Sequence, residues 1–189
     1  MENKQKISTR RIVFTALMAA LTVAGSALRI TMHIDIAGTT SFHLGNIMCA
    51  LSGILLGPWL GGLAAGLGSA IYDMMNPLYI SEAWITFLTK GAYGLVPGLV
   101  MLLWKKDWGV AKAAIASAAG AFTYAALYLF KIYFYSGRLL KGLTHEAAML
   151  AVAAKIPATV FNAVVAIIFA PILAVAIRKA LQKSHLTLE

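Results

Sequence analysis

Residues 53–73 read GILLGPWLGGLAAGLGSAIYD and join two apolar runs through the dipeptide Gly57-Pro58. Small residues recur at every fourth position, in the series Gly53, Gly57, Gly61 and Gly62, Gly66, Ala70. Helices in lipid gain no hydrophobic drive from touching one another, so small faces that allow close backbone approach favour their packing. The stretch predicts two short, closely packed helices joined by a tight turn, with Asp73 at the far end of the second.

The composition of the whole chain indicates a membrane protein. The 189 residues are 60% hydrophobic and only 12% charged, whereas soluble domains carry about a quarter charged residues. The apolar residues form blocks of about 18 or more, the length that spans a bilayer as a helix. Because further apolar runs follow the basic N-terminus MENKQKISTRR, we expect the first run to be retained rather than cleaved as a signal peptide.

The apolar runs predict an all-α integral membrane protein, a compact bundle of six transmembrane helices forming a single domain over residues 1–189. The predicted helices span about 12–28, 43–56, 59–74, 82–104, 110–135 and 146–177. The second and third are short for a bilayer. A short helix ends below the membrane surface and leaves a depression there.

The basic residues give an expected orientation, because they cluster at the ends of apolar runs. These residues are Lys4, Lys6, Arg10, Arg11, Lys105, Lys106, Lys112, Arg178, Lys179 and Lys183. The positive-inside rule places such clusters in the cytoplasm, so both termini are expected there. Loops 31–42, 76–81 and 136–144 then face outside. The net charge of +9 is read as a topology signal, with no nucleic-acid partner.

Six ionisable side chains lie in or beside the outer half of the predicted spans: Arg29, Asp73, Glu82, Lys90, Lys131 and Lys155. A charge at mid-bilayer costs at least about 2.5–3.5 kcal/mol, so each needs a partner or a polar cavity. Their common depth favours a chamber open to the exterior over a through-pore. Two alternatives stay open. Arg29 and Lys131 could extend to lipid headgroups, and the two deeper lysines could form structural ion pairs.

Other polar side chains are expected near the same chamber. His43 and Asn46 fall three residues apart at the outer end of the second predicted helix, and therefore on one face. They are candidate hydrogen-bonding groups for a polar ligand, with helix capping as the alternative. Asn162 follows Lys155 and Pro157 in the last span. Because Pro157 frees a backbone carbonyl, a local structural role for Lys155 or Asn162 is the other interpretation.

Aromatic side chains also gather in the outer half, among them Tyr72, Tyr79, Trp84 and Tyr93. Tyr and Trp are frequent in interfacial belts. Beside buried lysines they would suit a ligand with a flat ring and an anionic or polar tail. The full set of expected ligand-binding residues is His43, Asn46, Tyr72, Asp73, Asn76, Tyr79, Glu82, Trp84, Lys90, Lys131, Lys155 and Asn162.

Enzyme motifs are absent from the sequence. It has no Gly-x-Ser-x-Gly elbow, no Walker lysine loop and no metal-ligand spacing. We therefore expect no catalytic residue, no metal site, no cofactor of its own and no ATP hydrolysis by this chain.

The order of features along the chain resembles a known family. A basic N-terminus leads into an Ala-x-x-x-Ala stripe (Ala16, Ala20, extended by Ala24). The segment HLGNIMCALSGILLGPWLGGLAAGLGSAIYD, an Asn-Pro pair, WITFLTKGAYG and a last helix with Lys-x-Pro and Asn follow. This arrangement resembles the substrate-binding S-components of energy-coupling factor (ECF) vitamin transporters over nearly the whole chain.

The resemblance implies a transport subunit in the plasma membrane of a prokaryote, not an enzyme. Ala16, Ala20 and Ala24 would dock on a transmembrane coupling subunit, and two partner ATPase subunits would supply the energy. A vitamin would bind with high affinity in the outer half. The likeness around FHLGN and NPLYISEAWITF favours cobalamin as substrate. Pantothenate, folate and pyridoxine-type compounds are alternatives.

A different class of protein is also open, an integral-membrane enzyme acting on lipids with Asp73, Glu82 or His43 as acid or base. Such an enzyme would place acids and histidine deep and close together, whereas the deep groups here are lysines. A pore would need polar residues along its whole path, and the inner half is mostly apolar. The residues therefore argue against an enzyme and a pore, and the resemblance implies that the bound molecule is a vitamin.

Overall fold

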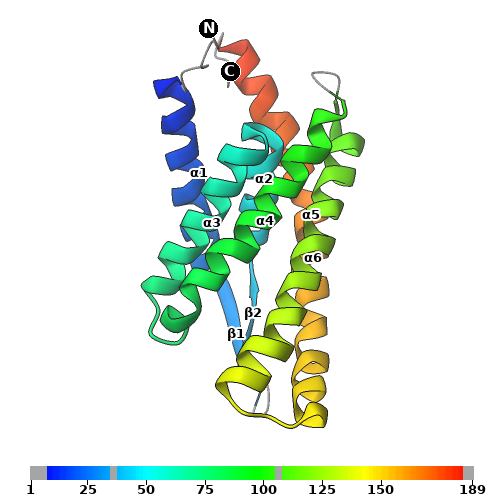
Figure 1. The fold of residues 1–189 in the computed structure, drawn as a ribbon. Coiled ribbons are helices and arrows are strands. Elements are labelled where there is room, and N and C mark those ends of the chain that lie inside the picture. The colour runs from blue at the N-terminus through cyan, green and yellow to red at the C-terminus, as the bar shows by residue number, and fades with distance from the viewer. Residues whose placement is uncertain (1–7, 35–37, 105–107, 185–189) are drawn as a thin grey trace, which may run out of the picture.

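The computed structural model describes residues 8–34, 38–104 and 108–184. Its α-helices are α1 (Thr9–Ala27), α2 (Gly45–Leu56), α3 (Pro58–Met74), α4 (Ala83–Leu102), α5 (Val110–Lys131) and α6 (His145–Lys183). Two strands, β1 (Arg29–Ile34) and β2 (Gly38–His43), lie between α1 and α2 (Figure 1). The one-turn 3-10 helix η1 (Ile80–Glu82) precedes α4, and the π-helix η2 (Ile132–Leu140) extends α5.

The two strands correct the all-α prediction. β1 and β2 form an antiparallel hairpin in which Arg29 pairs with His43 and Thr31 with Ser41. The segment was expected to be an outer loop because it lies between two apolar runs. Its β-branched residues favour an extended backbone instead. Non-helical backbone at membrane depth is tolerated where protein surrounds it, and the hairpin runs beside the helices rather than away from them (Figure 1).

Helix α2 forms the centre of the bundle. It contacts α1, α3, α4, α5 and α6, and ten of its twelve residues are buried. A helix of this length rises about 18 Å, well short of the hydrocarbon core of about 30 Å. Strand β2 and a polar cavity lie beyond the N-terminus of α2. The short helix therefore leaves room for the cavity, in agreement with the depression predicted from its length.

Glycines bring α2, α3 and α4 into backbone contact, as the small-residue series predict. A Cβ atom added to Gly53 would lie 2.0 Å from the carbonyl oxygen of Gly94, and one added to Gly94 would lie 2.5 Å from that of Gly61. Between α2 and α3, Gly57 has φ 78°, a conformation that glycine adopts without strain. Pro58 then starts α3 at its first position, where a missing N–H costs nothing.

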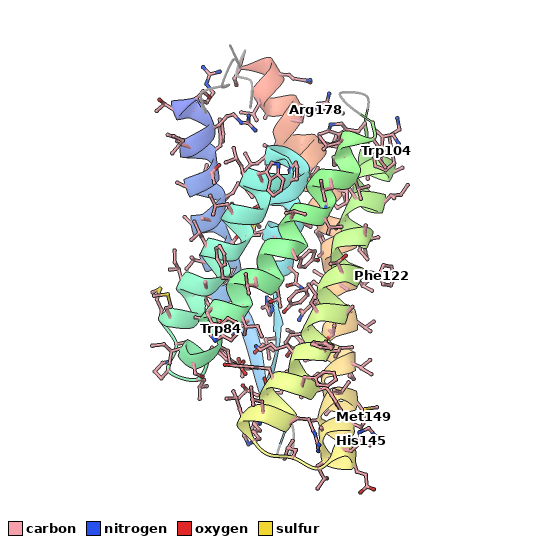
Figure 2. All side chains as sticks on the ribbon, viewed as in Figure 1. Trp84, Trp104, Phe122, His145, Met149 and Arg178 are labelled. Atoms are coloured by element: carbon pink, nitrogen blue, oxygen red, sulfur yellow. The ribbon has the colours of Figure 1, made fainter. Side chains whose placement is uncertain are left out.

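The outer surface of the bundle is strongly apolar. Large side chains such as Leu17, Phe122, Phe161 and Ile168 are at least half exposed, and Phe122 points away from the bundle (Figure 2). Within the described residues, four helical segments are long and apolar enough to cross a membrane: Thr9–Ala27, Ile80–Leu102, Val110–Leu140 and His145–Lys183. Together these features mark an integral membrane protein. Six crossings remain a prediction.

The start of α1 and the end of α6 lie at the same end of the bundle (Figure 1). Arg178 lies at this end too, as does Trp104 at the end of α4 (Figure 2). Four of the basic residues behind the expected orientation, Lys4, Lys6, Lys105 and Lys106, lie outside the described residues. The cytoplasmic location of the termini therefore stays a prediction.

Several helix ends differ from the predicted ones. α5 was expected to end near residue 135, but the helical path continues as η2 to Leu140, so most of the predicted loop 136–144 is helical. The loop was predicted to begin at Ser136, next to Gly137. In the structure, a Cβ on Gly137 would lie 2.8 Å from the carbonyl oxygen of Ile132, so the glycine permits the wide turn instead. α6 also continues past residue 177 to Lys183.

Candidate ligand-binding cavity

A cavity of about 460 Å³ lies toward the end of the bundle opposite the termini. It brings together ten of the twelve predicted ligand-binding residues: His43, Asn46, Tyr72, Asp73, Tyr79, Glu82, Lys90, Lys131, Lys155 and Asn162. These come from β2, η1 and the helices α2 to α6. The polar chamber predicted from the cost of membrane charges is therefore present at one end of the bundle.

The remaining two predicted residues lie outside the cavity lining. The side-chain oxygen of Asn76 accepts a hydrogen bond from the backbone N–H of Leu78 at 3.0 Å and so stabilises the turn after α3. Trp84 is 55% exposed and lies on the outer surface of α4 (Figure 2). Its indole Nε1 donates to the hydroxyl of Tyr135 at 3.3 Å. Both side chains have structural contacts away from the cavity.

Lys90 reaches the cavity from the middle of α4. Its ammonium donates a hydrogen bond to the side-chain oxygen of Asn46 on α2, and it lies 3.9 Å from the ring centre of Tyr124 on α5. An aromatic face and an amide oxygen both stabilise a cation. Lys90 is only 5% exposed. Among the described residues it has no carboxylate partner, so the predicted structural ion pair for this lysine is absent from that part of the chain.

Lys131 and Glu82 form the ion pair of the cavity wall. The Lys131 Nζ lies 2.6 Å from Glu82 Oε2, and the hydroxyl of Ser136 donates to Glu82 Oε1 at 2.7 Å. With Lys131 7% exposed, its extension to lipid headgroups, an alternative from the sequence, is wrong. The pair ties η1 to the junction of α5 and η2.

Removing one partner of this pair is expected to cost more than removing both. Glu82→Gln leaves the Lys131 charge buried without an anion, a change worth up to about 3–5 kcal/mol of stability. Lys131→Met/Glu82→Gln removes both charges and should recover much of that loss. Thermal unfolding of each purified variant in one detergent measures the cycle. Strictly additive effects of the two single substitutions would show that the two groups do not act as a pair.

Lys155 and Asn162 attach β2 to α6. The Asn162 side chain donates to the carbonyl oxygen of Ser41 at 2.9 Å and accepts from the backbone N–H of His43 at 3.0 Å. The Lys155 ammonium donates to the carbonyl oxygen of Thr39. Seven residues apart on one helix, the two side chains share a face. Asn162 therefore has structural contacts with β2, which differ from the local role beside Pro157 that the sequence left open.

His43 corrects a second prediction. It is the last residue of β2 rather than the first of a helix, although Asn46 does lie in the first turn of α2. The Nδ1 atom of His43 accepts from the backbone N–H of Gly45 at 3.2 Å, so it contributes to the start of α2. The imidazole also lines the cavity.

Arg29 closes the cavity from the hairpin side. Its guanidinium lies 4.1 Å from the ring centre of Tyr72 and 5.3 Å from that of Tyr79, and its Nε donates to the carbonyl oxygen of Ser26 at 2.7 Å. These contacts replace the alternative in which Arg29 extends to headgroups.

Two cavity-lining tyrosines on α5 were not predicted from the sequence. Tyr124 and Tyr128 line the cavity and stack with ring centres 5.6 Å apart. Tyr93, by contrast, is fully buried and stacks behind Tyr124 at 5.2 Å. A signal was available, since Tyr124, Tyr128 and Lys131 are spaced by four and three residues and so share one helix face. The three rings form an aromatic wall beside Lys90.

Within the described residues, no three His, Cys, Asp or Glu side chains come together as metal ligands. The groups around the cavity are cations, two carboxylates, imidazoles, amides, hydroxyls and aromatic faces. Such a set would suit a polar or charged organic molecule with a flat ring.

Two comparisons with known proteins found sequences similar to this chain. The sequence model of a family described as "ECF-type riboflavin transporter, S component" matches residues 6–179. A protein of Pyrococcus woesei, described as "Uncharacterized protein in gap 3'region", is 37% identical over 79 residues. That match covers 42% of this chain and 50% of the archaeal protein, so the chain matches about half the length of that relative.

Proposed function

The chain belongs to the family of ECF-type riboflavin transporter S components, and from this membership we propose that it captures a vitamin in the cavity and delivers it to an ATP-driven coupling module. The observation that supports the proposal most is the buried polar cavity at one end of an apolar bundle. The chain's part in the cycle is binding and release, and partner ATPase subunits supply the energy.

The proposal places the cavity on the outside of a prokaryotic plasma membrane. Arg10 and Arg11 lie in the first turn of α1, whose start lies at the other end of the bundle (Figure 1), and the positive-inside rule assigns that end to the cytoplasm. Arg178 and Lys179 near the end of α6 support this orientation.

The substrate we propose is a vitamin of about the size of riboflavin with a flat ring. The cavity volume of about 460 Å³ lies in the lower half of the range of small-molecule sites, about 300–1,000 Å³. The stacked Tyr124 and Tyr128 offer an aromatic face for a ring. Cobalamin, which the sequence favoured, is a much larger corrinoid. The volume and the family description therefore favour a smaller vitamin, with pantothenate, folate and pyridoxine-type compounds as further candidates.

For the coupling partner, we propose the face of α1 that carries Ala16, Ala20 and Ala24. All three are exposed, and the neighbouring Leu17 and Leu21 are 50% and 39% exposed. Such a flat, small-residue face allows a partner helix to approach closely. The proposed partner is a transmembrane coupling subunit, which joins this chain to two ATPase subunits.

Ligand identification tests the proposal directly. The protein is purified in detergent, and small molecules released by denaturation are identified by mass spectrometry. We expect one vitamin at close to one molecule per chain, and titration calorimetry of the ligand-free protein with that vitamin should give a tight single site. The variant Lys179→Met, whose substitution lies at the opposite end of the bundle, serves as a control and should bind equally well. If no water-soluble vitamin binds the purified protein, the proposed function is wrong.

A further inference from the structure

The cavity carries an excess of positive charge. Among the described residues, its lining includes five cations, Arg29, Lys90, Lys131, Lys141 and Lys155, against the two carboxylates of Asp73 and Glu82. The Nδ1 atom of His43 accepts a hydrogen bond from Gly45, so this imidazole carries at most one ring proton and is counted as neutral. Three of the lysines, Lys90, Lys131 and Lys155, are 5%, 7% and 3% exposed. Buried cations without an anion are costly, so the net positive charge of the cavity lining favours the binding of an anion.

Lys155 is the least compensated of the three. Lys131 has the carboxylate of Glu82, and Lys90 has both the Asn46 oxygen and the face of Tyr124. The partner of Lys155 is one neutral backbone oxygen, that of Thr39, and the part of the chain that the structure describes places no carboxylate within ion-pair distance of it. Its side chain lines the same cavity as Lys141, Lys131 and Glu82, so the net charge of these three neighbours is still positive.

We propose that the natural ligand carries an acidic group, a carboxylate or a phosphate, and presents it to Lys155. This inference rests on the proposed function and narrows its substrate class to acidic vitamins or their phosphate esters. The ring of such a ligand lies toward the aromatic wall of Tyr124 and Tyr128, and the acidic group lies toward α6. Lys141, exposed near the same end of the cavity, adds positive potential that attracts the anion.

Matched pairs of ligands, one acidic and one neutral, test the proposal. The pairs are pantothenate with panthenol, biotin with biotinamide, flavin mononucleotide with riboflavin, and pyridoxal phosphate with pyridoxal. Calorimetry on the purified full chain gives the dissociation constant of each member. In the pair that binds, we expect the acidic member to bind about ten- to a hundredfold more tightly, the gain from a charge-assisted hydrogen bond. Two of the acidic members carry a carboxylate and two carry a phosphate, so the pair that binds also shows which acidic group the protein recognises.

Lys155→Met separates charge recognition from structure. This substitution also removes the bond to Thr39, and loosening the hairpin would weaken both members of a pair alike. Loss of an ionic contact weakens only the acidic member, so the preference for it should disappear. Lys155→Arg should keep most of the preference, and Lys179→Met should keep all of it.

The outcomes of this experiment are distinct. A neutral member that binds as tightly as its acidic partner overturns the inference while leaving vitamin capture intact. A Lys155→Met variant that keeps the full preference also overturns it, because the acidic group then contacts another residue. If no member of any pair and no other vitamin binds, the proposed function itself is wrong and the inference is lost with it.

Discussion

Ala16→Trp and Ala20→Trp variants are expected to bind the vitamin normally and to lose nearly all transport. Both alanines lie on the exposed face of α1, whereas α1 contributes only Ser26, near its C-terminal end, to the cavity lining among the described residues. A tryptophan would hold a partner helix away from α1, because close contact there depends on small residues. A loss of about 3 kcal/mol in docking would reduce the complex with the coupling subunit by about a hundredfold.

Two measurements on the same variants check this result. Uptake of labelled vitamin is measured in cells that also express the coupling module, and binding is measured on the purified chain. The matched control is Ala126→Trp, because Ala126 is an exposed alanine on α5, away from α1. Weakened binding by Ala16→Trp, or an equal loss of uptake by Ala126→Trp, would contradict a docking role for this face of α1.

Gly94→Ala is expected to destabilise the protein severely, whereas Gly91→Ala on the same helix is expected to have little effect. A Cβ at position 94 would lie 2.5 Å from the carbonyl oxygen of Gly61 and 2.8 Å from the Cβ of Ala65. At position 91 the nearest atom would be 3.6 Å away, an ordinary contact. Overpacking of this kind costs about 1–3 kcal/mol, and a backbone oxygen has little room to move.

The comparison removes the intrinsic effect of the substitution, because alanine favours a helix over glycine at both positions. Thermal unfolding in detergent, followed by size-exclusion chromatography, gives the apparent midpoint of each variant. Gly53→Ala should be at least as damaging as Gly94→Ala, since its Cβ would lie 2.0 Å from the Gly94 oxygen. Equal midpoints for Gly91→Ala and Gly94→Ala would show that α3 and α4 separate without cost.

The helices were largely predictable from the sequence because a helix that spans lipid must consist mainly of apolar residues. The turn at Gly57-Pro58 and the close contacts of Gly53 and Gly61 follow from small residues at fixed spacing. The hairpin was not predicted, because Thr31 and Thr40 lie in a segment too polar to span a membrane, and such a segment is easily taken for a loop. The extended backbone, which the β-branched residues favour, is also held by hydrogen bonds between β2 and α6, more than a hundred residues further along the chain.

The cavity-lining residues that the sequence predicts most directly are those whose charge is costly inside a membrane. Lys90, Lys131 and Lys155 stand out in apolar runs, and the structure brings them to one cavity. Their partners could not be deduced, because the contacts of Lys131 with Glu82 and of Lys90 with Asn46 link residues 49 and 44 positions apart. Tyr124 and Tyr128 were overlooked because a tyrosine in an apolar run has no comparable cost. Which lysine meets which oxygen depends on the packing of whole helices.

Helix α6 is attached to the backbone of β2, whereas the cavity is lined by the side chains of β2. Asn162 and Lys155 bind backbone atoms of Thr39, Ser41 and His43, and every amino acid at those three positions offers the same carbonyl group, and all but proline the same N–H. The side chains of the strand, which line the cavity, can therefore be exchanged without detaching the strand. Substitutions along β2 are therefore expected to change the lining of the cavity while the attachment of the hairpin to α6 is preserved.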